Sequence, residues 1–266
     1  MPLHKKVAVV VALTALALLA SFTLAWPTRD VVLAGRPFTL SGRTLLGLIV
    51  IGLACAGTDA LVRGHAKAQP EQSPRVSLHW ILPAAMTAVA WALLAQPLRL
   101  EQRIAIVLAV SAVLLLLIAV EYHTADLAAP WRPAVRLALQ LATYGVAALV
   151  YATVRLTIPL RANAALSIAV ASAAMGLRLL SENERILGRV GLSALGLGAL
   201  LGVISSLLYP RIPAPVAYSL LLVVYLYVAT GLLRQLLLGQ LQPHDQALAA
   251  AEAQGRRKGG RGDRVL

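Results

Sequence analysis

Ionisable side chains that could transfer protons or bind a divalent cation lie mainly at the ends of long apolar segments in this chain. They are Asp59, His65, His79, Glu121, His123, Asp126, Glu182 and Glu184. Carboxylates and imidazoles gathered on one face of a protein are suited to proton transfer or to metal binding. No HxxxH, HExxH or DxxxD spacing places two ligands on one helical face, so ordinary solvation in polar joints is the simpler interpretation.

Asp59 is the most informative single residue, because it lies inside an apolar segment and Arg63 follows one helical turn later. An unpaired carboxylate at that depth would be costly. An i,i+4 pair neutralises the acid and lets the long arginine side chain extend toward water. We therefore expect Asp59 and Arg63 to form a structural ion pair, with an ion or proton site as the alternative.

Glu121 ends another apolar segment and is followed by Tyr122 and His123. A buried acid at this position could face Arg136 or Arg178 on neighbouring helices and connect them through an ion pair. We expect such a connection, or plain solvation at the membrane surface. A proton relay through Glu121 and His123 is the alternative.

These residues lie on segments that we interpret as membrane-spanning helices. A bilayer core about 30 Å thick needs roughly 20 apolar residues in an α-helix. Hydrophobic residues make up 59% of the chain, charged residues 13%, and the mean hydropathy is +0.77, which excludes a water-soluble fold. We place eight spans at about 7–26, 44–63, 79–98, 103–122, 134–156, 162–180, 187–209 and 215–238.

The sequence therefore predicts an all-α, polytopic transmembrane helix bundle, because single strands and open loops leave backbone groups unsatisfied in lipid. Ser181 and Glu184 fit a capping box that would begin the seventh helix. We interpret the first span as a retained helix. A cleaved signal peptide is the alternative, since Lys5 and Lys6 precede the apolar run and Thr23-Leu24-Ala25 follows it.

Small residues form a stripe along the seventh span at every fourth position. They are Ala194, Gly198, Gly202 and Ser206. Small side chains let two helix backbones approach closely where lipid supplies no hydrophobic drive. The sixth span is rich in Ala, Ser and Gly, so we expect it to be the intrachain partner of this stripe, in preference to a second copy of the chain.

Polar residues, most of them tyrosines, occur in the fifth and eighth spans. Gln140, Tyr144 and Tyr151 share one face of the fifth span and are expected to hydrogen-bond other helices, with a substrate-lining stripe as the alternative. The eighth span carries a second set that does not share one face and is expected on the helix surface. That set is Tyr218, Tyr225 and Tyr227.

The carboxyl terminus changes character after Leu241. Residues 1–241 are expected to form the transmembrane domain, and 242–266 a disordered, basic tail near anionic lipid headgroups. The net charge of +13 does not predict nucleic-acid binding, because the basic residues are divided between the two sides of the membrane.

The last eighty residues resemble a family of uncharacterised bacterial polytopic membrane proteins. The resemblance rests on Gly188-Arg-Val-Gly-Leu-Ser-Ala-Leu, on Ser205-Ser-Leu-Leu-Tyr-Pro and on Gly231-Leu-Leu-Arg-Gln-Leu-Leu-Leu-Gly-Gln-Leu. It implies location in a bacterial inner membrane and transfers no activity or site residue.

These observations favour a non-catalytic structural or accessory membrane component without a cofactor, acting with another membrane protein or as a homo-oligomer. A small-solute, ion or proton-coupled transporter is the first alternative, although no span has a central proline of the kind that breaks transporter helices. An intramembrane enzyme is the second. It would need an acid, a base and a nucleophile at one depth, and the sequence offers only Asp59, Glu121 and scattered histidines.

The basic residues and the even number of spans predict that both termini lie in the cytoplasm. This orientation places 16 of the 24 Lys and Arg residues inside, or 11 against 8 without the tail. Reporter fusions after Gln242 and after Pro210 should therefore report opposite sides of the membrane. An extracytoplasmic signal at Gln242 would contradict this topology.

Overall fold

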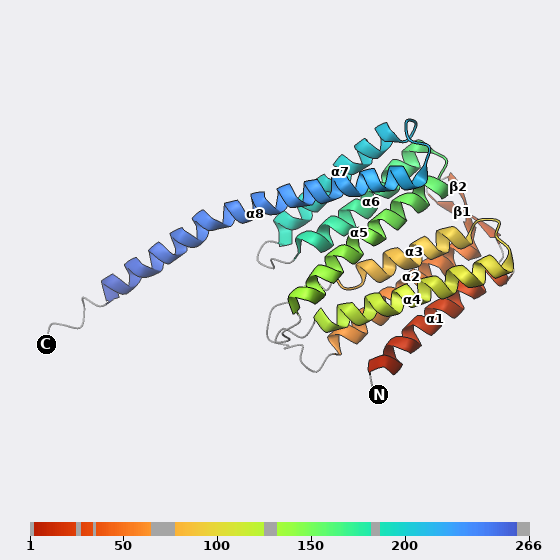
Figure 1. The fold of residues 1–266 in the computed structure, drawn as a ribbon, viewed down its shortest axis with the longest axis horizontal. Helices are drawn as coiled ribbons and strands as arrows, with labels where there is room; N and C mark the ends of the chain where they lie inside the picture. The colour runs from red at the N-terminus through yellow and green to blue at the C-terminus, as the bar shows by residue number, and fades with distance from the viewer. Residues whose placement is uncertain are drawn as a thin grey trace.

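The computed structural model describes residues 3–24, 28–33, 36–64, 78–124, 132–181 and 187–259, and the predictions for His65, Asp126, Glu182 and Glu184 lie outside them. Figure 1 shows the chain as a bundle of helices with one small hairpin of strands. The elements are α1 Leu3–Thr23, β1 Thr28–Leu33, β2 Arg36–Ser41, α2 Gly42–Arg63, α3 Ile81–Leu94, α4 Leu100–Thr124, α5 Arg132–Thr157, α6 Arg161–Leu180, α7 Leu187–Leu208 and α8 Pro215–Gly259.

Seven of the described helices are long and apolar enough to cross a membrane, as expected of a multi-pass membrane protein. The remaining predicted span, the third at 79–98, is the shorter helix α3 of 14 residues. At 1.5 Å per residue it is about 21 Å long, less than the thickness of a bilayer core. It ends before Pro97 because a proline restricts the preceding residue to extended conformations.

Helix α3 is short, but much of its surface is buried by neighbouring helices. Its buried residues are Ile81, Leu82, Pro83, Met86, Thr87, Val89, Ala90 and Leu94. It packs against α2 and α4 on one side and against α5 and α6 on the other. Because other helices cover it on several sides, α3 depends little on contact with lipid along its length.

The helices form two four-membered rings with the same connectivity. In the first ring α1, α2, α3 and α4 each pack against the next, and α4 returns to α1. In the second ring α5, α6, α7 and α8 repeat this arrangement. The rings meet along a seam where α3 contacts α5 and α6, and α4 contacts α5 (Figure 1).

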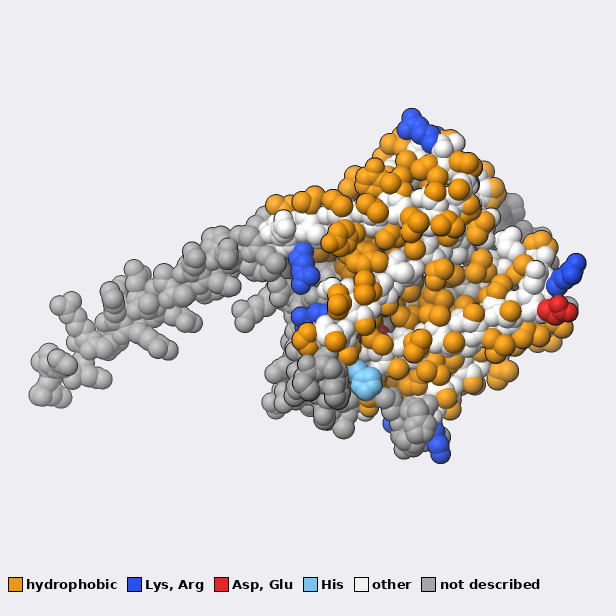
Figure 2. Space-filling model, viewed as in Figure 1, with side chains coloured by type: hydrophobic (Ala, Val, Ile, Leu, Met, Phe, Trp, Pro, Cys, Tyr) orange, Lys and Arg blue, Asp and Glu red, His pale blue; other side chains and the backbone are white. Residues whose placement is uncertain are grey.

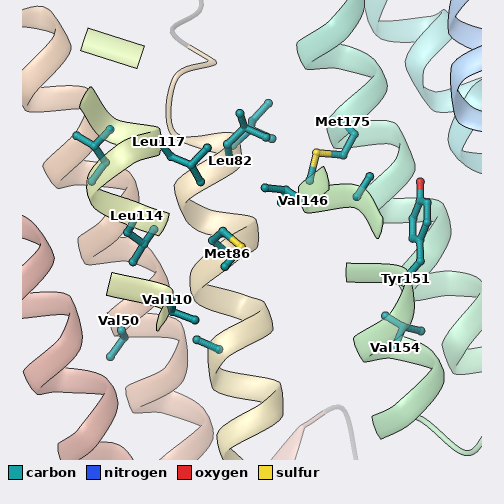
Figure 3. Packing of buried hydrophobic residues seen from close by; sticks show 14 of the residues in the cluster. Val50, Leu82, Met86, Val110, Leu114, Leu117, Val146, Tyr151, Val154 and Met175 are labelled. Carbon is teal, nitrogen blue, oxygen red and sulfur yellow. The ribbon is translucent and has the colours of Figure 1, made fainter. Parts of the chain in front are cut away.

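The seam between the rings is apolar along most of its length. Figure 3 shows Leu82 and Met86 of α3 on one side, and Val146 of α5 with Met175 of α6 on the other. Each of these four side chains is buried. Methionine is flexible and polarizable, so Met86 and Met175 can fill irregular gaps between the two rings.

The strands β1 and β2 pair antiparallel between α1 and α2, with Thr28 opposite Ser41 and Leu33 opposite Arg36. This hairpin is an addition to the predicted helical bundle. We call its side of the molecule the hairpin end. The opposite side, where α1 begins and the α8 span emerges, is the termini end (Figure 1).

The closest helix contact that the structure describes involves the small-residue stripe of α7. A Cβ atom added to Gly198 would lie 2.5 Å from the carbonyl oxygen of Ala169, and one added to Gly202 would lie 2.9 Å from Cβ of Ala169. Ala194 is buried beside Gly176 of α6. The stripe thus faces α6, the helix that the sequence analysis named as its partner.

The fourth member of the stripe, Ser206, makes a polar contact with the same helix. Its hydroxyl oxygen accepts a hydrogen bond of 2.9 Å from Nε of Arg161, the first residue of α6. Close backbone packing and this hydrogen bond together join α6 and α7 along the whole stripe.

Two boundaries differ from the predictions. Ser181 does not begin the seventh helix: it ends α6, its amide donates to the carbonyl of Leu177, and its hydroxyl donates to the carbonyl of Arg178. Helix α8 continues to Gly259, where the sequence analysis expected a disordered tail from 242. Residues 242–254 are rich in Ala and Gln, which are good helix formers.

Helix α1, for which a cleaved signal peptide was the alternative, packs against α2 and α4. Val7, Val11, Leu18 and Phe22 are its buried apolar residues. Its removal would uncover the surfaces of α2 and α4 against which these residues pack.

Two glycines of α7 provide a matched test of the α6–α7 contact. Gly198→Ala should lower the thermal stability of the purified protein, because the added methyl group would collide with the α6 backbone. Gly196→Ala should be neutral or stabilise by roughly 0.5–1 kcal/mol, since a Cβ there meets no atom within 4 Å and alanine favours helix. Equal melting temperatures for the two variants would refute the close contact.

Candidate functional site

A buried carboxylate at the termini end is the centre of the candidate site. Glu121 lies in the last turn of α4, Arg178 in the last turn of α6, and His79 two residues before the first residue of α3. These three ends meet on the same side of the bundle because α4 and α6 run parallel and α3 runs opposite to both. We call His79, Glu121 and Arg178 the Glu121 cluster.

The arginine of the cluster binds both oxygens of the carboxylate. Arg178 donates to Oε1 of Glu121 from Nε at 3.3 Å and from Nη2 at 3.0 Å. Nη2 also donates to Oε2 at 2.9 Å. A planar guanidinium matches the two oxygens of a carboxylate, so the contact between Arg178 and Glu121 is bidentate.

The histidine of the cluster binds the same carboxylate from another element. Nδ1 of His79 lies 2.7 Å from Oε2 of Glu121. This distance is that of a hydrogen bond between the ring nitrogen and the carboxylate. The hydrogen bond fixes the ring of His79 and joins the beginning of α3 to the end of α4.

Burial makes these contacts energetically important. The side chain of Glu121 is 0% exposed, that of Arg178 is 13% exposed and that of His79 is 26% exposed. Removing a carboxylate from water is expensive unless its charge is paired and its oxygens are hydrogen-bonded. Glu121 meets both conditions, and Arg178 thereby links the second ring to the first.

The other predicted pair is closer to water. Nε of Arg63 lies 2.7 Å from Oδ2 of Asp59, with 71% and 26% of the two side chains exposed. The second oxygen of Asp59, Oδ1, is buried and has no hydrogen-bond partner. This pair lies within α2, so it connects no helices.

Two further candidates among the described residues at this end are at the surface. His123 is exposed, and its ring meets that of Tyr122 edge-on at 6.0 Å. Arg136, the other predicted neighbour of Glu121, is exposed at the beginning of α5. Among the residues that the structure describes, no group of three or more His, Cys, Asp or Glu side chains could hold a metal ion.

Hydroxyl pairs join the helices of the second ring at other depths. Tyr151 of α5 is buried and its hydroxyl lies 2.7 Å from that of Ser172 of α6. The hydroxyl of Tyr144 lies 3.2 Å from that of Thr230 of α8. These tyrosines therefore contact two different helices, as expected for interhelical hydrogen bonds.

A second polar cluster, at the hairpin end, was missed by the sequence analysis. Tyr218, expected on the helix surface, is 0% exposed, and its hydroxyl lies 2.6 Å from that of Ser205. The guanidinium carbon of Arg155 lies 4.1 Å from the ring centre of Tyr209. The sequence places arginines and tyrosines at neighbouring span ends, and this pattern could have predicted the cluster. We call Arg155, Arg161, Ser206, Tyr209 and Tyr218 the arginine–tyrosine cluster.

Comparison with known proteins gives a family without an assigned activity. Residues 24–247 match the model of a family described as protein of unknown function (DUF5656). The chain belongs to this family. The match begins directly after α1 and includes both clusters, so it is far longer than the last eighty residues that carried the resemblance. No curated protein and no solved structure matches the chain.

The energetic weight of the Glu121 cluster can be tested against the Asp59 pair. Glu121→Gln should destabilise this member of the DUF5656 family by roughly 3–5 kcal/mol, because Arg178 is left buried without a counterion. Asp59→Asn should cost only about 0–1 kcal/mol, since its partner is largely exposed. Chemical unfolding of the purified variants measures both values.

The double variant Glu121→Gln with Arg178→Gln controls for the stranded charge. Two amides can hydrogen-bond each other without a buried charge, so the double variant should be more stable than Glu121→Gln alone. The single variant Arg178→Gln completes the comparison. If the double variant loses as much stability as the two single variants added together, direct pairing is contradicted.

Proposed function

We propose that this DUF5656 protein is a non-catalytic structural or accessory component of a membrane assembly. The proposal rests on the hydrogen-bond partners of Glu121: both carboxylate oxygens are bound by Arg178, and one also by His79. A carboxylate that carries protons or ions must exchange partners during each cycle. Glu121 is instead held by a bidentate contact with the chain's own cation.

Two further observations support a scaffolding role. The hydroxyls of Tyr144, Tyr151 and Tyr218 all bond other helices, so these groups stabilise the bundle. The seam between the rings is filled by apolar side chains, including Leu82 and Met86. Such a core favours a rigid body that other membrane proteins can pack against.

A proton-coupled or ion-coupled transporter is the second candidate. The two rings meet along a seam, and the Glu121 cluster spans that seam at the termini end. Transporters built from two repeated bundles move one bundle against the other around a site at their interface. Release of Arg178 from Glu121 would be the corresponding motion here.

A flux measurement separates the two candidates. The purified chain in liposomes should show no proton, sodium or potassium flux that differs from the flux of the Glu121→Gln/Arg178→Gln variant. Asp59→Asn is the control, because it alters a carboxylate outside the seam. A flux that is lost in the double variant and kept in Asp59→Asn would establish transport in place of the accessory role.

Native electrophoresis tests the accessory role itself. The protein extracted from its own membrane in mild detergent should migrate in a complex larger than the purified chain. Migration at the size of the single chain would contradict an accessory or oligomeric role.

A further inference from the structure

Two arginines at the hairpin end are held in place by neutral groups. The guanidinium carbon of Arg155 lies over Tyr209 at 4.1 Å and within 5.9 Å of the ring centre of Tyr218, and its Nε lies 3.4 Å from the carbonyl oxygen of Ile212. Nε of Arg161 donates to the hydroxyl of Ser206. The aromatic faces and the hydroxyl fix the two side chains, and among the described residues neither arginine pairs with an acid.

The tyrosine beneath Arg155 is itself fixed. The hydroxyl of Tyr209 donates to the carbonyls of Ile158 and Pro159, at 2.7 and 3.1 Å, in the connection between α5 and α6. Arg155 and Arg161 flank that connection, and Ser206 and Tyr209 lie one turn apart at the end of α7. The two arginines therefore belong to one preorganised cluster.

The apolar segments of the second ring contain no carboxylate. Residues 132–181 and 187–237 contain neither Asp nor Glu. Among the described residues, Arg63 and Arg178 each pair with an acid, whereas Arg155 and Arg161 bind a carbonyl and a hydroxyl through Nε. Arg211 adds a third positive charge in the turn after α7. The terminal nitrogens of the Arg155 and Arg161 guanidinium groups can therefore donate to an external anion.

The cluster lies at the depth of lipid headgroups. The apolar part of α5 ends at Thr157, that of α6 begins at Arg161, and that of α7 ends at Leu208. Figure 2 shows basic side chains at the edges of the molecule and a broad apolar surface between them. Phosphate groups of the membrane lie at the same level as the edges of this apolar surface.

We propose that Arg155 and Arg161 form a binding site for a phosphate group, supplied by the headgroup of an anionic phospholipid. A guanidinium matches phosphate oxygens with two parallel donors, and two immobilised guanidiniums can hold one phosphate between them. The lipid chains would then lie along the apolar surface of α5 to α7. Free phosphate from water is the other source of the same chemistry, and it does not use that apolar surface.

The test measures lipid binding to the purified full-length protein. Native mass spectrometry and thermal stability are recorded with phosphatidylglycerol and with phosphatidylcholine of the same acyl chains. The wild type should retain phosphatidylglycerol in preference and gain stability from it. In Arg155→Gln/Arg161→Gln the affinity for phosphatidylglycerol should fall roughly 30-fold. This factor corresponds to a loss of about 1 kcal/mol for each of the two basic residues.

Two variants control for charge and folding. Arg99→Gln removes an exposed arginine in the turn between α3 and α4 and should leave the preference for phosphatidylglycerol unchanged. Arg155→Lys/Arg161→Lys keeps both charges but not the planar fork, so it should retain part of the affinity. The difference in stability between the two lipids is compared within each variant, which removes any loss of folding stability common to both.

The outcomes are distinct. Loss of the lipid preference in the glutamine variant, but not in Arg99→Gln, supports the site. An unchanged preference in the glutamine variant overturns it. If inorganic phosphate stabilises the wild type as strongly and displaces phosphatidylglycerol, the phosphate site remains but the assignment of a lipid ligand is overturned.

Discussion

The structure depends on one constraint: a polar group inside a membrane protein must find its partner within the protein. Glu121 is the strongest case, because its charge is buried and its partners are Arg178 of α6 and His79, two residues before α3. That requirement fixes how the ends of three helices meet across two rings. The paired hydroxyls of Tyr151 with Ser172, and of Tyr218 with Ser205, apply the same constraint to neutral groups.

Different contacts hold the helices within a ring and between the rings. Within the second ring, Gly198 and Gly202 let α7 approach the backbone of α6, so dispersion over a long contact contributes most. Between the rings, the short helix α3 supplies apolar side chains and the Glu121 cluster supplies directional bonds at one end. Apolar packing alone permits sliding along the seam, whereas a bidentate ion pair allows only one arrangement.

Local patterns in the sequence were sufficient for the helices, for the small-residue stripe and for Arg178 as a possible neighbour of Glu121. They were insufficient where the partner is distant: His79 meets Glu121 from 42 residues away, and Tyr218 meets Ser205 across the α7–α8 turn. The prediction that Ser181 begins a helix was wrong. A capping motif is recognised from only four residues, whereas the Ser181 hydroxyl donates to a carbonyl of the preceding helix. The 28–41 hairpin has no apolar period that distinguishes it from a loop.

The arginines at the two ends of the bundle have different kinds of partner. At the termini end, Arg63 and Arg178 meet carboxylates of the chain itself. At the hairpin end, Arg155 meets tyrosine faces and a carbonyl, which attract a cation but leave its charge in place. A chain with a net charge of +13 therefore balances only part of its charge through its own acids. At the hairpin end, the proposed site at Arg155 and Arg161 would balance a further part with the phosphates of the bilayer.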